Sequence, residues 1–195
     1  MSPALKRISP AEYLELDRAA ATRSEYFFGE VIAMSGASGP HNFIVSNIIG
    51  ETRAALKGGP CRVAPSDLRT RTTTGAYCYP DVSIICGPPQ YDDDRLDILL
   101  NPRVIFEVLS PSTESYDRGS KFVQYRSILS LQAYVLVSQR DPIVECFFRQ
   151  AGQREWSFTD AQGLDSVISI PGVSIELSLR EIYDNIEFPP RGPLA

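Results

Sequence analysis

The sequence is poor in histidine and cysteine, which limits the metal chemistry that the chain can carry. His41 is the only histidine among 195 residues, so a histidine-based metal cluster is excluded. Cys61, Cys78, Cys86 and Cys146 are irregularly spaced, and no CxxC pair offers the spacing of a structural zinc site. We predict buried thiols here rather than disulfides or metal ligands.

Long hydrophobic runs are also missing. No apolar run approaches the roughly 20 residues that are needed to span a bilayer. The N-terminus, residues 1–7, carries Lys6 and Arg7 but no apolar stretch, so a secretory signal is not expected. The sequence therefore predicts a cytoplasmic protein without membrane association.

Positive charge is in deficit, because the formal net charge is -5. Nucleic-acid binding is normally supplied by clustered Lys and Arg, so this balance counts against non-specific binding of DNA or RNA. The objection is met only if the basic residues gather on one face, away from acidic residues such as Asp92, Asp93 and Asp94.

Two common catalytic motifs are absent. Gly36-Ala-Ser-Gly39 lacks the Lys-Ser/Thr pair of a phosphate-binding P-loop, so no nucleotide cofactor is implied. Ser110 and Ser112 flank Pro111 without the Gly-x-Ser-x-Gly frame of a nucleophile elbow, and they indicate a tight turn.

The remaining composition is that of an ordinary globular domain, with 43% hydrophobic and 22% charged residues. The length suits one domain, which we place at residues 1–188, followed by a flexible Pro-rich C-terminal tail at 189–195.

Hydrophobic periodicity predicts an α/β fold of the α+β type, in which helices pack on a central mixed sheet. Ser9, Pro10 and Glu12 indicate a capped helix start, and Ser178 with Glu181 indicates another. The expected elements are a helix at 9–20, a hairpin at 25–28 and 30–34, a helix at 41–57, strands at 61–64, 67–73, 79–86 and 103–109, a helix at 115–129, a strand at 133–138, a hairpin at 143–149 and 154–159, and a last short helix.

Two carboxylates stand out within the apolar strands. Asp81 opens one strand, and Glu107 is the only charge in another, so burial would make their ionisation costly without a partner. If the strands pair antiparallel with Cys86 facing Pro102, Asp81 lies directly opposite Glu107, with Cβ atoms roughly 5 Å apart. A divalent cation bound by oxygen ligands would relieve their repulsion.

An alternative explains the same residues without metal. Asp81 would cap a turn after Pro80, and Glu107 would form a salt bridge with a Lys or Arg of a helix. Strand and charge arguments alone weigh these two interpretations about equally.

Several motifs resemble a known family. Pro80-Asp81 followed by Glu107-x-Leu109 resembles the PD-(D/E)XK signature of metal-dependent nucleases. More narrowly, the chain resembles the Uma-type family of restriction endonucleases over about residues 9 to 150. The segments that carry this resemblance are Phe28-Gly29-Glu30-Val31, Met34-Ser35-Gly36 with His41, Pro65-Ser66-Asp67, Tyr79-Pro80-Asp81-Val82, and Glu107-Val108-Leu109-Ser110-Pro111-Ser112-Thr113 followed by Asp117 and Lys121.

The resemblance implies a restriction-endonuclease-like core with a site for Mg²⁺ or Mn²⁺. Asp81, Glu107 and the Val108 carbonyl would hold the metal. The general signature places Lys at the position of Leu109, so the resemblance assigns the catalytic role to Lys121 on the following helix. The alternative for Lys121 is an exposed helical ion pair with Asp117.

Four further residues are candidate accessory groups. His41 is placed by the resemblance near the edge of the site, although a lone histidine is more often structural. Glu30 would add an outer carboxylate to the metal or solvate a strand end. Asp67 would orient a water or cap a turn, and Asp117 accompanies Lys121.

The resemblance implies Mg²⁺-dependent endonucleolytic hydrolysis of DNA, so DNA is the expected partner, and a homodimer is left open. Two alternatives remain. One is a catalytically silent nuclease-fold module that binds DNA or protein, and the other is a metal-dependent phosphohydrolase for a smaller substrate.

Overall fold

The computed structural model describes residues 7–34 and 36–188. The predicted flexible tail at 189–195 lies outside these residues, and the single-domain boundary at 188 stays a prediction. No helix in the described ranges is long and apolar enough to cross a membrane.

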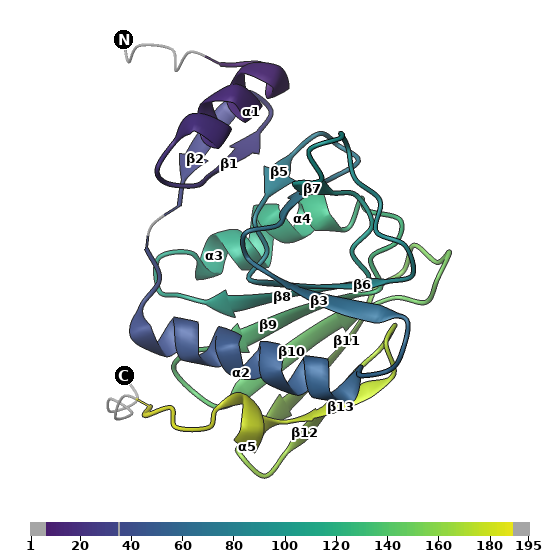
Figure 1. The fold of residues 1–195 in the computed structure, drawn as a ribbon. Helices are drawn as coiled ribbons and strands as arrows, with labels where there is room; N and C mark the ends of the chain where they lie inside the picture. Colours follow the sequence, from purple (N-terminus) through teal and green to yellow (C-terminus); the bar gives the residue numbers. More distant parts are fainter. Residues whose placement is uncertain (1–6, 35, 189–195) are drawn as a thin grey trace.

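A six-stranded mixed sheet forms the centre of the molecule (Figure 1), which confirms the predicted fold class. Its order is β11-β10-β9-β8-β6-β3; β8 and β9 run parallel, and the other neighbours are antiparallel. The strands are β3 (Cys61–Pro65), β6 (Val82–Cys86), β8 (Val104–Leu109), β9 (Ala133–Ser138), β10 (Ile143–Phe148) and β11 (Ser157–Gln162).

A second sheet of five short strands, in the order β2-β1-β5-β4-β7, carries the N-terminal hairpin. Its turn has positive φ at Phe28 (48°) and at Gly29 (98°), the backbone that a two-residue hairpin loop requires. The strands are β1 (Ser24–Phe27), β2 (Glu30–Ala33), β4 (Arg69–Arg71), β5 (Tyr77–Cys78) and β7 (Ile98–Leu99), and a separate hairpin consists of β12 (Val167–Ile170) and β13 (Ile175–Ser178).

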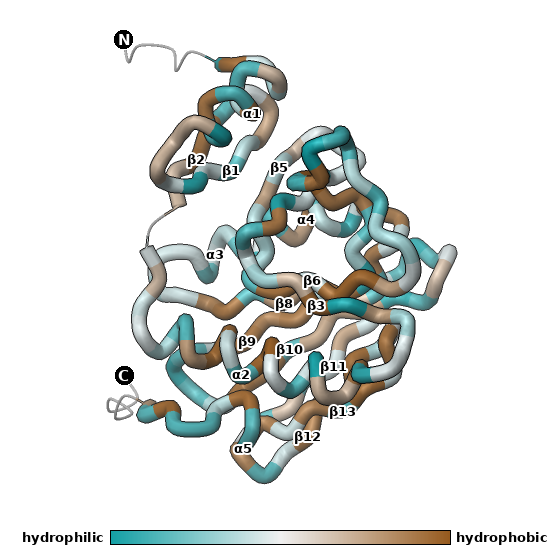
Figure 2. Tube along the Cα trace, viewed as in Figure 1, coloured by the Kyte–Doolittle hydropathy of each residue, from teal (hydrophilic) through white to brown (hydrophobic). Residues whose placement is uncertain are grey.

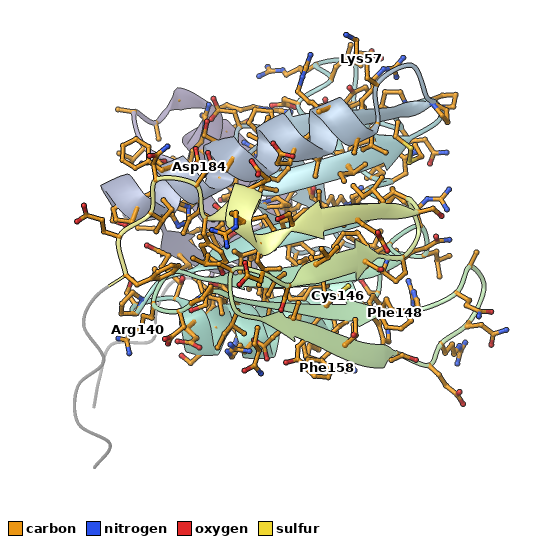
Figure 3. All side chains as sticks on the ribbon, turned by 90° about the horizontal axis from the view of Figure 1, so that it is seen from below. Lys57, Arg140, Cys146, Phe148, Phe158 and Asp184 are labelled. Atoms are coloured by element: carbon orange, nitrogen blue, oxygen red, sulfur yellow. A yellow bond between two sulfur atoms is a disulfide. The ribbon has the colours of Figure 1, made fainter. Side chains whose placement is uncertain are left out.

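Helices cover both faces of the central sheet, except that the first helix packs on the second sheet. They are α1 (Pro10–Ala19), α2 (Gly39–Ala55), α3 (Glu114–Tyr116), α4 (Phe122–Tyr125) and α5 (Leu179–Ile182), with a π-helical turn at Asp117–Lys121 between α3 and α4. Figure 3 shows α2 and the β12–β13 hairpin side by side over one face, with Lys57 and Phe158 on opposite sides of the view. The hydrophobic residues concentrate in the central strands (Figure 2).

Strand alternation divides the core into two parts. In β8, Val104, Phe106 and Val108 pack on the side of α2, whereas Ile105 and Leu109 pack with residues of α4 and β9 on the other side. Leu109 is therefore a buried core residue, which explains why the strand does not supply a lysine at this position.

Several predicted elements differ from the structure. The strand expected at 79–86 begins only at Val82, as β6, and the short strand β5 before it was not predicted. The helix expected at 115–129 ends at Tyr125 and contains the π-helical turn. The β12–β13 hairpin was not predicted. The capping box of α1 is confirmed, but Ser178 makes no side-chain hydrogen bond as the cap of α5.

The cysteine prediction is wrong for one pair. Cys61 and Cys86 form a disulfide, because the antiparallel register of β3 and β6 places them directly opposite one another. Cys78 and Cys146 are buried thiols, as predicted. Disulfides are rare in reducing compartments, so the cytoplasmic location stays a prediction.

Candidate active site

A pocket of about 390 Å³ lies where β8 ends. Its walls are β2 with the segment that follows, the first turns of α2, residues 110–113, and the π-helical turn. In Figure 1 the β1–β2 hairpin and α1 stand apart from the central sheet, with the start of α2 below them. Segments far apart in the sequence thus enclose this pocket.

The strands carrying the two central carboxylates pair as predicted. Val82 faces Phe106 and Ile84 faces Val104, and this antiparallel register places Asp81 opposite Glu107. Asp81 Oδ2 accepts a hydrogen bond of 2.8 Å from the Val108 backbone N–H. Both carboxylates and Val108 line the pocket.

His41 lies in the first turn of α2, which Ser38 caps, and its ring also faces the pocket. His41 Nε2 lies 3.2 Å from Asp81 Oδ1, and His41 Nδ1 lies 3.4 Å from Gln139 Nε2. Burial lowers the pKa of His41, but the hydrogen bond and charge of Asp81 outweigh it, so the pKa is raised. The imidazole is therefore poised to hold a proton beside Asp81.

Glu107 is held at the bottom of the pocket, where its side chain is only 3% exposed. Its Oε1 lies 2.9 Å from Lys121 Nζ and accepts a hydrogen bond of 3.0 Å from the Tyr125 hydroxyl. Burial raises the pKa of Glu107 well above its usual value; the charge of Lys121 opposes this rise, and nearby carboxylates add to it. Positive charge bound beside Glu107 would lower this pKa.

Lys121 contacts three carboxylates at once. Its Nζ lies 2.9 Å from Glu107, 3.1 Å from Glu25 Oε1 and 3.6 Å from Asp117 Oδ1. Burial lowers the pKa of Lys121, but these carboxylates outweigh it and raise the pKa well above its usual value. The ion pair with Asp117 exists, but with Lys121 6% exposed, the interpretation as an exposed surface pair is wrong.

Glu25 is a pocket residue that the sequence analysis missed. Besides Lys121, its carboxylate accepts hydrogen bonds from the Tyr79 backbone N–H at 2.9 Å and from the Tyr116 hydroxyl at 2.8 Å. The sequence carried a weaker form of the signal that identified Glu107, since Glu25 directly precedes an aromatic run, Tyr26-Phe27-Phe28.

Glu30 and Asp67 are not brought to the pocket. Glu30 is 55% exposed and lies 3.7 Å from Arg7, and Asp67 is 83% exposed and lies 3.6 Å from Arg23. Their positions match the alternatives of a solvated strand end and a turn residue. Of the accessory candidates, only His41 and Asp117 line the pocket.

The salt bridge expected without metal is present, because Glu107 pairs with a helical lysine. It leaves negative charge uncompensated, since four carboxylates, those of Glu25, Asp81, Glu107 and Asp117, line the same pocket as two groups that can carry positive charge, Lys121 and His41.

The donor set fits a hard divalent cation. In the described part of the chain, no three His, Cys, Asp or Glu side chains converge as a ready-made metal cage. Mg²⁺ does not require one, because it usually keeps several waters and is held by one or two carboxylates together with substrate phosphate. Asp81 and Glu107, opposed at one end of the strands, supply such a pair.

Comparison with known proteins agrees with this architecture. The chain is similar to a crystal structure of "a putative nuclease belonging to DUF820" from Anabaena variabilis, with a TM-score of 0.72 and 20% identity, over 90% of this chain and 97% of the other. This likeness concerns the fold.

Two uncharacterized proteins of Synechocystis sp. are similar in sequence. One is 32% identical over 183 residues, which cover 93% of this chain and 94% of the relative, and the other is 33% identical over 171 residues, which cover 87% and 96%. The model of the Uma2 family, described as "Putative restriction endonuclease", matches residues 10–180. The chain therefore belongs to the Uma2 family of restriction-endonuclease-like proteins.

Proposed function

We propose that the protein is a divalent-metal-dependent endonuclease that hydrolyses phosphodiester bonds of DNA. The observation that carries the proposal is the buried contact of Lys121 with Glu107, Glu25 and Asp117 in a pocket that also contains Asp81. A cluster of titratable groups with shifted pKa values in a concave site is typical of catalysis.

Asp81, Glu107 and the Val108 carbonyl would hold Mg²⁺ or Mn²⁺. The metal would lower the pKa of a bound water and neutralise charge on the phosphate. Proteins with this fold generally use divalent metals, and the surplus of carboxylates supports such a role here.

Lys121 is the group that would act on the reacting atoms. Its ammonium would orient the attacking water and stabilise the charge that develops on the phosphate oxygens. Glu25 and Asp117 hold that ammonium from two sides, so its position is set before DNA binds. The hydroxyl of Tyr125 orients Glu107.

His41 and Gln139 have a supporting role. His41 fixes one oxygen of Asp81 while the Val108 N–H fixes the other, which leaves the remaining lone pairs of Asp81 for the cation. Gln139 donates a hydrogen bond of 2.8 Å to the Leu109 carbonyl and in this way ties the end of β8 to the wall of the pocket.

Circular DNA incubated with Mg²⁺ or Mn²⁺ tests the proposal, as supercoiled plasmid and as circular single strand. We expect the wild type to cut at least one form, EDTA to stop the reaction, and Glu107→Ala to be inactive. Glu176→Ala, at the exposed position of β13, is the matched control and should cut normally. Metal-independent cleavage, or no cleavage of either form, would contradict the proposal.

A further inference from the structure

The charged groups of the pocket lie deep. Side-chain exposure is 3% for Glu107, 4% for Glu25, 5% for Asp117 and 6% for Lys121, and it reaches only 15% for Asp81. A scissile phosphate must therefore enter the pocket to meet them, because contact at the outer surface does not reach these groups.

The pocket is small. Its volume, about 390 Å³, lies near the lower end of the roughly 300–1,000 Å³ of pockets that enclose one small molecule. It suits a single nucleotide.

The lining lacks the charge pattern of a duplex-binding surface. Among the described residues that line the pocket, Lys121 is the only Lys or Arg, and its ammonium is already engaged by carboxylates. Duplex binding draws on several phosphate contacts made by such side chains. This pocket offers one position for phosphate.

The outer wall is apolar and accessible. Ile32 and Ala33 are both exposed in β2, and together with Ala37 and Val45 of the facing wall they line the pocket. An unpaired base presents a flat apolar face, and packing it against these aliphatic side chains removes apolar surface from water. In a duplex that face is covered by neighbouring bases.

From depth, size, charge and lining together, we infer that the pocket accepts one nucleotide of an unpaired DNA strand, and that fully paired duplex is a poor substrate. This inference rests on the proposed function and adds the class of substrate. A duplex must lose pairing and stacking locally before its phosphate reaches Asp81 and Glu107, and that opening costs free energy.

Three oligonucleotides of the same sequence test the inference with Mg²⁺ or Mn²⁺: a single strand, a perfect duplex, and a duplex with a short internal mismatched bubble. We expect the single strand and the bubble to be cut at least about tenfold faster than the perfect duplex, with cuts in the bubble confined to unpaired nucleotides. Equal or faster cutting of the perfect duplex would overturn the inference and leave the proposed function standing.

Binding gives a readout that does not depend on cleavage. With Ca²⁺ in place of Mg²⁺, fluorescence anisotropy of the labelled single strand should show at least about tenfold tighter binding than that of the duplex. If no DNA is cut, the proposed function fails, and binding alone then decides whether the pocket selects unpaired strands. Equal binding of both forms would refute that selection.

A variant that narrows the entrance tests whether DNA uses this pocket. Ala37→Trp adds bulk at an exposed position on the rim, and Ala151→Trp, in the exposed turn after β10, adds the same bulk elsewhere. We expect Ala37→Trp to slow single-strand cleavage about tenfold at an unchanged melting temperature, and Ala151→Trp to have no effect. Equal rates for both variants would show that the strand does not enter here.

Discussion

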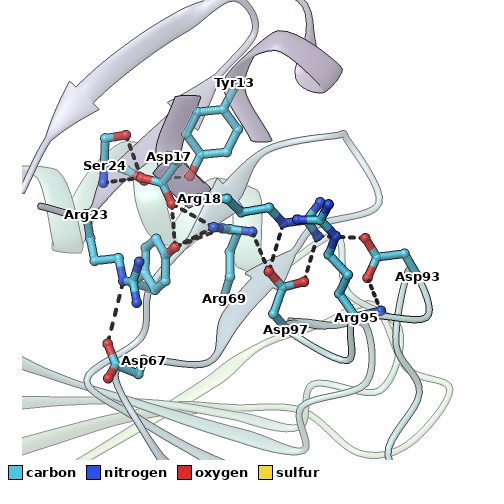
Figure 4. A network of polar contacts seen from close by, with 11 residues as sticks. Tyr13, Asp17, Arg18, Arg23, Ser24, Asp67, Arg69, Asp93, Arg95 and Asp97 are labelled. Atoms are coloured by element: carbon cyan, nitrogen blue, oxygen red, sulfur yellow. Dashed lines mark hydrogen bonds and ion pairs between the residues drawn. The ribbon is translucent and has the colours of Figure 1, made fainter. Parts of the chain in front are cut away.

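Two clusters of buried and partly buried charge lie close together in this molecule, and they differ in how completely the charges are paired. In the first (Figure 4), Arg69 pairs with Asp17 at 2.6 Å and lies 3.6 Å from Asp97. Arg18 pairs with Asp97 at 2.7 Å and with Asp93 at 2.6 Å. We call this the arginine network, and two guanidinium groups face three carboxylates in it.

The pKa values of the buried carboxylates shift from their usual values in opposite directions in the two clusters. Burial raises the pKa of Asp17, but hydrogen bonds from Tyr79, Ser24 and Arg69 outweigh it and lower the pKa below its usual value. In the pocket, burial dominates and raises the pKa of Glu107 and of Asp117. Each carboxylate of the arginine network pairs with a guanidinium group, although Arg69 Nη1 is buried without a hydrogen-bond partner among the described residues. The pocket instead keeps a surplus of carboxylates that a cationic ligand can neutralise.

Tyr79 joins the two clusters. Its hydroxyl donates to Asp17 at 2.6 Å, and its backbone N–H donates to Glu25 at 2.9 Å. The network therefore holds α1 and β1 against the body of the protein, and this placement delivers Glu25 to Lys121.

The largest expected difference between the clusters is in the stability of matched carboxylate-to-amide variants, one in each cluster. Asp17→Asn leaves the buried guanidinium of Arg69 without its main partner, and we expect a loss of about 3 kcal/mol in the free energy of unfolding. Glu107→Gln removes a carboxylate from a site with too many, so we expect equal or higher stability in EDTA. Denaturant melts measure both, and a comparable loss in Glu107→Gln would assign a structural role to the pocket.

Removal of the lysine should separate catalysis from binding. Lys121→Ala should lower the rate of DNA cleavage by about 100-fold or more while metal binding stays nearly intact. Arg118→Ala is the matched control, because Arg118 is 37% exposed and pairs with Glu114 and Glu145. Wild-type cleavage by Lys121→Ala would refute the assignment.

Metal should stabilise the pocket and not the arginine network. At a metal concentration 100 times the dissociation constant, the wild type should gain about 2.7 kcal/mol by mass action. Thermal melts with Mg²⁺ or Mn²⁺ should show this gain in Asp17→Asn and its loss in Glu107→Gln. The same gain in Glu107→Gln would place the metal elsewhere.

Asp17 and Glu107 should make the free energy of unfolding in EDTA depend on pH in opposite directions. The folded-state pKa of Asp17 is lowered, so its contribution is present above the unfolded value of about 3.8 and is lost as pH falls below it. The folded-state pKa of Glu107 is raised, so its contribution is present below the unfolded value of about 4.5 and is lost as pH rises. Melts of the wild type and both amide variants across this range should show the penalty of Asp17→Asn shrinking in acid and the benefit of Glu107→Gln growing toward neutral pH.

The register of β6 and β8 was predicted correctly from one assumed pair, Cys86 with Pro102, although β7 lies in the connection between the two strands. In an antiparallel pair of strands, one known pair of facing residues determines every other pair, including Asp81 with Glu107. The disulfide was not predicted because it needs the separate pairing of β3 with β6, and no spacing motif marks Cys61 and Cys86.

Glu25 was missed for a related reason. Its signal in the sequence is weaker than that of Glu107, because Arg23 and Ser24 precede it, and the long-range contact of β1 with β5, at Tyr26 and Tyr77, brings it to the site. The π-helical turn carries no pattern of its own, and Gly119 within it only lowers the helix propensity.

The π-helical turn determines which sequence changes the segment between Asp117 and Lys121 can tolerate. Each helical residue advances about 100° around the axis, so losing one residue between Asp117 and Lys121 would turn one side chain away from the other. The carbonyl of Asp117 is also fixed, because it accepts a hydrogen bond of 2.9 Å from the Tyr134 hydroxyl. The three residues between, Arg118, Gly119 and Ser120, are exposed. We therefore expect related proteins to differ freely in the identity of these three residues. Insertions and deletions between Asp117 and Lys121 should be eliminated by selection.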